Sequence, residues 1–284
     1  MISKLINIIG YSFFWFISLI PLSLLNLLSY LINFIFFYRK KIVLNNIKLA
    51  FPNKSNLEIK NIYKGFKLYF INLIWEIIKM SSSNIKFYKK RINIQNINLI
   101  NDYYKKNQSV IIIGGHYNNW EWAGPILSEI GNHHFVSVYK ALSNTFFNKL
   151  MIKIRSRYNI DVVEMNDLVK YIFGNEKCKM IALISDQNPV VDEKTKWLSF
   201  FNHQVPVIDG PEKIAKKFNY PVLFCDIKKV KNGYYNITFE TIEDYPQESE
   251  DGDITKRFFK RLEKQINDNP NNYLWSHNRW KHKK

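Results

Sequence analysis

Short apolar runs alternate with stretches of helical spacing along most of the chain beyond residue 100. β-branched and aromatic residues dominate the apolar runs, which predicts buried strands. The segments between them repeat apolar residues every three or four positions, which predicts amphipathic helices. Strands joined by crossover helices pair in parallel, because each helix returns the chain to the same edge of the sheet. We therefore expect an α/β fold with a largely parallel central sheet and flanking helices.

The boundaries of these elements follow from the same pattern. The expected strands are Val110–Ile113, Phe135–Tyr139, Asp161–Val163, Met180–Ser185, Val222–Ile227 and Tyr235–Glu240. The helices expected between or after them are Thr145–Arg157, Asp167–Phe173, Pro211–Phe218 (behind the candidate cap Asp209) and Asp253–Gln265. Before the first strand, Ser55 and Glu58 have the spacing of a capping box, which predicts a longer helix over Asn56–Met80.

The amino-terminal segment has a different pattern. Leu5–Tyr38 is nearly uncharged and exceeds the ~20 residues that a membrane-spanning helix needs, but Pro21 divides it. A basic run at residues 39–41 outweighs the single lysine before the apolar segment, which favours a cytoplasmic location for the rest of the chain. We expect a membrane anchor at residues 1–38, spanning or re-entrant, and one cytoplasmic domain at residues 39–284. The alternative is a helical hairpin buried in a soluble domain.

Composition adds a strong positive charge to this picture. The chain has 41 Lys and Arg against 24 Asp and Glu, a formal net charge of +17. Such a surplus predicts an acidic partner, which is nucleic acid, an anionic membrane surface or an acidic protein. The two cysteines, Cys178 and Cys225, are too few and too far apart for a disulfide scaffold or a thiolate metal site. We expect no metal site.

One segment, Val110–Gly124 (VIIIGGHYNNWEWAG), carries the most specific chemistry. Its apolar run ends in Gly114 and Gly115, which permit a sharp turn and a close approach to a ligand. His116 comes directly after them, at the carboxyl end of the expected strand. Open α/β sheets place their ligands at this edge.

His116 and Glu121 have the chemistry of a general base and the carboxylate that orients it. The pair requires His116 on the turn and Glu121 in the first turn of a helix that begins near Trp120, capped by Asn118 or Asn119. Alternatively, Glu121 is merely favoured there by the helix dipole.

Other candidates stand at comparable places. Asp186 lies directly after the strand Met180–Ser185, where a catalytic role and a helix-capping role are equally compatible with its position. Arg155 and Arg157 lie in a basic helix. Such residues either form a solvated face or bind a phosphate through the forked guanidinium.

The segment GGHYNNWEWAG resembles the late acyltransferases of lipid A biosynthesis, the lauroyl/myristoyl transferase family of Gram-negative inner membranes. These carry an HxxxxD/E motif, and the NWEW form resembles the branch found in Bacteroidetes. The resemblance extends over essentially the whole chain. It includes the blocks Tyr38–Lys60, Val138–Asn159, Ile184–Pro189 (ISDQNP) and Tyr273–Lys281 (YLWSHNRWK).

The resemblance implies a glycerolipid-acyltransferase-like domain in which His116 is the base and Glu121 its partner. It places a functional arginine on Arg155, with Arg157 as the near alternative, and a functional aspartate on Asp186. Lys140 would share a phosphate-binding role, and Asn119 is a further candidate for substrate binding. The expected substrate-binding set is therefore Arg155, Asp186, Lys140 and Asn119.

The same resemblance implies the substrates and the location. The donor would be an acyl carrier protein or coenzyme A thioester, used as co-substrate without a cofactor. The acceptor would be a hydroxyl of an anionic lipid A precursor, at the cytoplasmic face of the cell inner membrane. Nucleic acid is not an expected partner.

Two other functions remain open from the sequence. A glycerolipid or aminolipid O-acyltransferase would use the same HxxxxD/E chemistry. A non-enzymatic basic protein that binds membranes or nucleic acid would explain the net charge alone, although not the His116–Glu121 spacing after a Gly-Gly turn.

Overall fold

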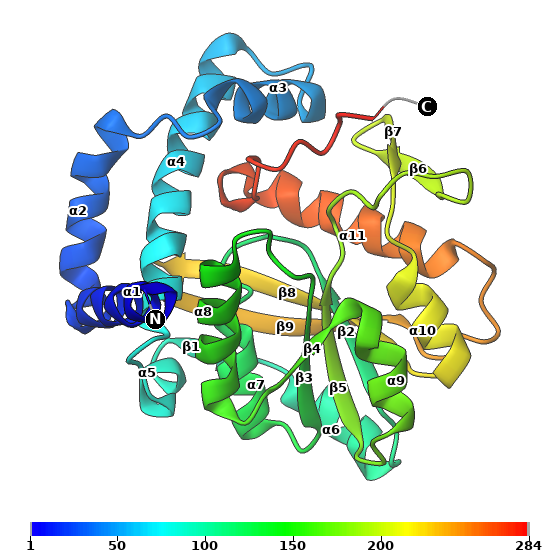
Figure 1. The fold of residues 1–284 in the computed structure, drawn as a ribbon. Coiled ribbons are helices and arrows are strands. Elements are labelled where there is room, and N and C mark those ends of the chain that lie inside the picture. Colours follow the sequence, from blue (N-terminus) through cyan, green and yellow to red (C-terminus); the bar gives the residue numbers. More distant parts are fainter. Residues whose placement is uncertain (1, 283–284) are drawn as a thin grey trace.

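The computed structural model describes residues 2–282, so Met1 and residues 283–284, at the outer ends of the expected anchor and domain, lie outside the described residues. A sheet of seven strands in the order β1-β9-β8-β2-β5-β3-β4 forms the centre of the molecule (Figure 1). The strands are β1 (Ile92–Ile94), β2 (Val110–Gly114), β3 (His134–Tyr139), β4 (Asp161–Glu164), β5 (Lys179–Ile184), β8 (Val222–Lys231) and β9 (Tyr234–Glu243).

All neighbouring strands in this sheet pair in parallel except β8 and β9, which form an antiparallel hairpin. The expected α/β fold with a largely parallel sheet is therefore confirmed. Every strand expected from the sequence is present, with ends that differ by a few residues. The short edge strand β1, which the apolar pattern did not reveal, joins the sheet beside β9.

Helices cover both faces of the sheet. One layer contains α5 (Ile85–Lys89), α6 (Ile97–Lys105), α7 (Ala123–Ile130) and α8 (Thr145–Arg155), and the other contains α9 (Leu168–Phe173), α10 (Gly210–Phe218) and α11 (Asp253–Asp268). Successive residues of β2 face opposite layers: Ile111 packs with the second layer and Ile112 with the first. This alternation divides the core into two clusters.

A long helix, α4 (Asn56–Lys79), connects the sheet with the amino-terminal part (Figure 1). The predicted capping box is present, because Ser55 Oγ accepts the backbone N–H of Glu58 and the Glu58 carboxylate accepts the N–H of Ser55. The block Tyr38–Lys60, in which the resemblance implies a helix after the anchor, contains α3 (Lys40–Ala50). Elements not expected from the sequence include α5, α6, the antiparallel pair β6 (Trp197–Phe200) and β7 (His203–Pro206), and the short 3₁₀ helices η1 (Ser156–Tyr158), η2 (Met165–Asp167) and η3 (Pro270–Asn272).

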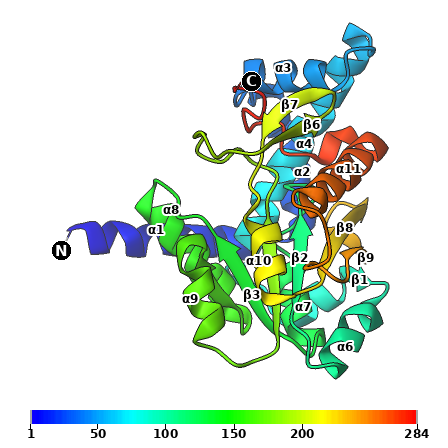
Figure 2. The ribbon, with the colours of Figure 1, turned by 90° about the vertical axis from the view of Figure 1, so that its right-hand side faces the viewer.

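The amino-terminal segment forms two helices, α1 (Ile2–Leu19) and α2 (Leu22–Ile35), which break at Pro21 as expected. Across residues 2–282, none of the helices taken singly has the length and hydropathy to cross a membrane. The stretches Ile8–Leu19 and Leu22–Ile35 reach that length and hydropathy only together, and they meet at a bend of 104°. Figure 2 shows α1 projecting away from the sheet.

Candidate active site

The register of two parallel strands brings His116 and Asp186 together. Gly114, the last residue of β2, lies opposite Ile184, the last residue of β5. His116 and Asp186 each lie two residues further along, so their side chains leave the same edge of the sheet side by side. His116 Nδ1 lies 2.5 Å from Asp186 Oδ1.

The Gly-Gly turn that precedes His116 is compact. A Cβ atom on Gly115 would lie 2.6 Å from Leu262 Cδ1, so a side chain here would force Leu262 of α11 to move away from the turn. The backbone oxygen of His116 accepts the N–H of Leu274 (2.9 Å), which ties the turn to the carboxyl-terminal segment. His116 is thus held in place through both its backbone and its imidazole ring.

Asp186 is ionised behind the imidazole. Its side chain is only 2% exposed. Burial alone would raise the pKa of the Asp186 carboxyl, but the charge and hydrogen bonds of His116 outweigh burial, and the pKa is lowered from its usual value. An ionised carboxylate accepts hydrogen bonds only, so Nδ1 of His116 carries the proton and Nε2 is left as the basic nitrogen.

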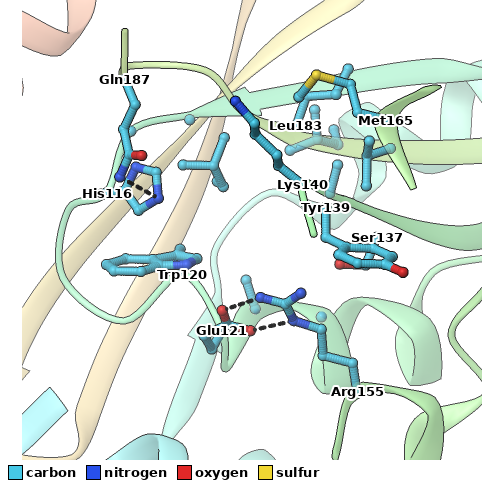
Figure 3. A pocket seen from close by; sticks show the side chains of 18 of the residues that line it. His116, Trp120, Glu121, Ser137, Tyr139, Lys140, Arg155, Met165, Leu183 and Gln187 are labelled. Atoms are coloured by element: carbon cyan, nitrogen blue, oxygen red, sulfur yellow. Dashed lines mark hydrogen bonds and ion pairs between the residues drawn. The ribbon is translucent and has the colours of Figure 1, made fainter. Parts of the chain in front are cut away.

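The exposed side of the imidazole faces Gln187 and Trp120 (Figure 3). His116 Nε2 lies 3.2 Å from Gln187 Nε2. The Trp120 ring meets the imidazole edge to face, with ring centroids 4.7 Å apart. Gln187 was not among the predicted site residues, although it directly succeeds Asp186 in the ISDQNP block and therefore shares its strand end.

Glu121 has a different partner from the one expected. Its carboxylate receives two hydrogen bonds from Arg155, from Nε at 2.9 Å and from Nη2 at 2.5 Å, and not from the imidazole of His116 (Figure 3). The reason is local geometry: residues 120–122 form a turn and α7 begins only at Ala123, later than predicted. Glu121 is directed toward α8 instead of folding back on His116.

The Glu121–Arg155 pair is a permanent charge pair. Burial raises the pKa of Glu121, but the adjacent guanidinium outweighs it and the pKa is lowered. Burial lowers the pKa of Arg155, but Glu121 outweighs it and the pKa is raised. Since the guanidinium fork is already engaged by Glu121, a forked contact between Arg155 and a phosphate, as expected from the sequence, would compete with this pair.

The alternative arginine lies elsewhere. Arg157 donates to the backbone oxygens of Met80 (2.5 Å) and Ser83 (3.3 Å). Arg155 lines the large cavity beside the imidazole, whereas Arg157 is not among the residues of its wall. Geometry therefore puts Arg155, and not Arg157, beside Glu121 at the site.

Asn119 was expected to bind substrate, but it points into the protein. It is 1% exposed, and its Nδ2 donates to Glu76 Oε2 at 2.6 Å. Its Oδ1 accepts the backbone N–H of Trp122 at 3.1 Å, a capping bond that starts the turn before α7. The hydroxyl of Tyr235 donates to the same Glu76 oxygen (2.7 Å). Asn119 thus supports the loop from beneath.

The cavity beside the imidazole has a volume of about 940 Å³ and lies between the sheet and the layer of α7 and α8. Small residues on neighbouring elements create it: Gly114, Ser137, Ala182 and Cys225 on the strands, and Ala123 and Gly124 on α7. His116, Glu121, Arg155 and Gln187 line it, and the exposed Lys140 stands on its wall. Its volume is at the upper end of the range for small-molecule sites, and its inner wall is apolar, which suits a long hydrocarbon chain.

The carboxyl-terminal segment braces the Asp186 loop. The backbone N–H of Asn188 donates to His277 Nε2 (3.2 Å), and Asn188 Nδ2 donates to the backbone oxygen of Asn278 (3.0 Å). Arg279, 1% exposed, donates to Asn188 Oδ1 and to the backbone oxygen of Pro206 (2.8 Å). The WSHNRW block is therefore structural support for the loop that carries Asp186.

One family of known proteins matches the chain over nearly its full length. The family model described as bacterial lipid A biosynthesis acyltransferase matches residues 1–282. No curated protein matches the chain.

Proposed function

Because the chain belongs to the bacterial lipid A biosynthesis acyltransferases, we propose that it transfers a fatty acyl chain from an acyl thioester to a hydroxyl of a lipid A precursor. The observation that carries this proposal is the imidazole of His116, held by the buried Asp186 at the wall of a cavity of about 940 Å³. Family membership makes the chain an acyltransferase, so a purely non-enzymatic binding function is set aside.

His116 acts as the general base. Its Nδ1–H donates to Asp186, which leaves Nε2 free to take the proton of the acceptor hydroxyl. Asp186 stabilises the imidazolium that forms, the role that the sequence suggests for Glu121. The hydroxyl oxygen then attacks the thioester carbonyl carbon, and the carbonyl oxygen becomes negatively charged.

Gln187 stabilises that oxyanion. Its amide lies 3.2 Å from Nε2, in the place that the hydroxyl must occupy. The arriving hydroxyl displaces the amide, which then donates to the developing negative charge. Collapse of the intermediate breaks the carbon–sulfur bond, and the imidazolium gives its proton to the thiolate. The products are an ester and a free thiol.

The acyl chain lies in the apolar cavity, and the charged residues at its wall serve the polar parts. The Glu121–Arg155 pair fixes α8 against the loop that carries His116. Lys140, which is exposed at the cavity, is the cation best placed for a phosphate of the acceptor or the donor. The preferred acyl chain length depends on the depth of the cavity.

The substrates and the location complete the proposal. The net charge of +17 favours an acidic acyl carrier protein as donor and an anionic lipid as acceptor. The exposed apolar side chains of α1 and α2 hold the protein at the cell inner membrane, with the catalytic domain on the cytoplasmic face.

The direct test is acyl transfer by the purified full-length protein in detergent. Labelled acyl carrier protein and coenzyme A thioesters are offered with lipid A precursor, a glycerolipid and an aminolipid, and the products are identified by mass spectrometry. We expect an ester on the lipid A precursor. Transfer to the glycerolipid or the aminolipid instead would show that the chemistry is correct and the acceptor wrong.

A further inference from the structure

The outer faces of α1 and α2 are apolar and unpartnered within the described part of the chain. Many of their large side chains are at least 60% exposed, among them Ile9, Phe13, Phe16, Leu27, Leu31 and Phe34. A soluble surface rarely exposes so many large apolar side chains on one pair of adjacent helices. The basic residues Lys40 and Lys41 lie shortly after α2 and are exposed. An apolar face beside positive charge matches the surface of an anionic bilayer.

The carboxyl end of α1 is held by α4. Lys79, at the end of α4, donates from Nζ to the backbone oxygens of Ser18 and Ile20 (3.1 Å for the latter). The Ser82 hydroxyl donates to the backbone oxygen of Ser18 at 3.0 Å. Lys79 is only 8% exposed, and a cation at a helix carboxyl end is favourable. The break between α1 and α2 is thus attached to the catalytic domain.

The carboxyl end of α2 is held by the same helix, about three turns earlier. Lys67 donates from Nζ to the backbone oxygen of Asn33 at 2.6 Å. The rings of Phe36 and Tyr38, just beyond α2, pack against Phe70 with centroids 5.8 and 5.6 Å apart. Both ends of α2 therefore lie against α4, on the same side of any membrane as the catalytic domain.

The middle of α1 is held by α8. Tyr11 stacks on Phe146 with ring centroids 5.2 Å apart (Figures 1 and 2 show the two helices adjacent). A Cβ atom on Gly10 would lie 2.6 Å from Phe146 Cζ, so a side chain at this position would force the Phe146 ring to move. The residues between Tyr11 and Ser18, the two places where α1 is held, span only ~11 Å as a helix. The hydrocarbon core of a bilayer is ~30 Å thick.

From these contacts we infer that α1 and α2 insert into one leaflet of an anionic bilayer without crossing it, which leaves the amino terminus on the same face as the catalytic domain. The inference rests on the membrane location in the proposed function and decides between the spanning and re-entrant forms left open by the sequence. It has a functional consequence, because α8 contacts α1 through Phe146 and lines the cavity through Arg155. A single helix separates the lipid surface from the acyl cavity.

Protease protection of the full-length protein tests the inference. A cleavable tag is placed at the amino terminus, and spheroplasts are compared with inverted inner-membrane vesicles. We expect cleavage only in inverted vesicles, where the catalytic domain is also accessible. Cleavage in spheroplasts would place the amino terminus across the membrane and overturn the inference. Acyl transfer is measured on the same samples, so loss of the proposed function and loss of this topology give separate results.

Depth measurements in vesicles of phosphatidylethanolamine and phosphatidylglycerol give a second test. Single cysteines carrying a fluorophore replace Phe16, Phe34 or, as a control, the exposed Tyr104 on α6, with Cys178 and Cys225 changed to alanine. Nitroxide-labelled lipids should quench the fluorescence of the labels that replace Phe16 and Phe34 several-fold, and the quenching should place both labels at a shallow depth in the bilayer. The control label should remain unquenched. Equal quenching at all three positions, or none at Phe16 and Phe34, would contradict insertion of this face.

Discussion

Two buried carboxylates, Asp186 and Glu121, lie at the loop that carries His116, yet each binds a different kind of basic side chain. Asp186 binds the imidazole of His116, a group that can take up and release a proton. Glu121 binds the guanidinium of Arg155, which stays charged. The first pair can move a proton, whereas the second can only fix geometry and charge. The distinction comes from the register of β2 and β5, not from the spacing along the chain.

The largest expected effect is that of removing the base. His116→Ala should lower kcat by roughly 10³–10⁴-fold, the upper part of the range for general base catalysis. The variant should stay folded but unfold at a lower midpoint than the wild type, because it leaves the buried Asp186 carboxylate without its partner. Steady-state transfer and thermal unfolding are measured together. An active His116→Ala protein would remove His116 from the mechanism.

The comparison between the two carboxylates is tested by isosteric amides. Asp186→Asn should lower kcat by roughly 10²–10³-fold, because an amide cannot stabilise the imidazolium or hold the required tautomer. Glu121→Gln should lower kcat by only roughly 10-fold, since Glu121 acts on geometry and not on the proton. The substitution should mainly lower the free energy of unfolding, by about 3 kcal/mol, because it leaves the buried guanidinium without a counter-charge. If Glu121→Gln were folded and as inactive as Asp186→Asn, the result would instead support the pairing of His116 with Glu121 that was expected from the sequence.

A smaller effect is expected at the second pair. Arg155→Lys should reduce activity by roughly 3–10-fold and lower the unfolding midpoint, because a lysine cannot form both hydrogen bonds to Glu121. Arg157→Lys is the matched control from the same region of the chain and should keep its activity. The kinetic parameters of the two variants are compared: a larger loss in Arg157→Lys would move the functional arginine to that position.

The smallest effect concerns acid stability. Burial lowers the pKa of His277 to about 4, against an ordinary value of 6.5. Between these values the unfolded chain binds a proton that the folded protein does not, so stability falls as the pH falls from 6.5 toward 4. His277→Gln should flatten this dependence when the free energy of unfolding in urea is compared at about pH 7 and about pH 5. An unchanged pH dependence in His277→Gln would contradict the assignment.

Apart from the short edge strand β1, the strands of the sheet could be predicted in advance because they are apolar runs separated by helical patterns. The β6–β7 pair could not, because it is short and packs on the carboxyl-terminal segment, with the rings of Phe200 and Phe201 against Trp280. At the site, Asp186 was predicted as a candidate from its strand end, but its pairing with His116 depends on which strands are neighbours. Strand order is set by long-range packing, which local patterns do not encode.

Glu121 and Asn119 illustrate the same limit. Their spacing from His116 is compatible with a helix that starts near Trp120. In the fold, however, Asn119 donates a hydrogen bond to the buried Glu76, and Glu121 accepts hydrogen bonds from Arg155. Both partners are distant in the sequence. The motif therefore pointed to the loop after β2, while the identity of each contact required the fold.

The sharing of the His116 Nδ1 proton with Asp186 is tested most directly by NMR. Protein labelled with ¹⁵N-histidine should show a strongly downfield, slowly exchanging imidazole proton in the wild type. We predict that this resonance persists in Glu121→Gln and disappears in Asp186→Asn and His116→Ala. A resonance that survives in Asp186→Asn and disappears in Glu121→Gln would contradict the pairing.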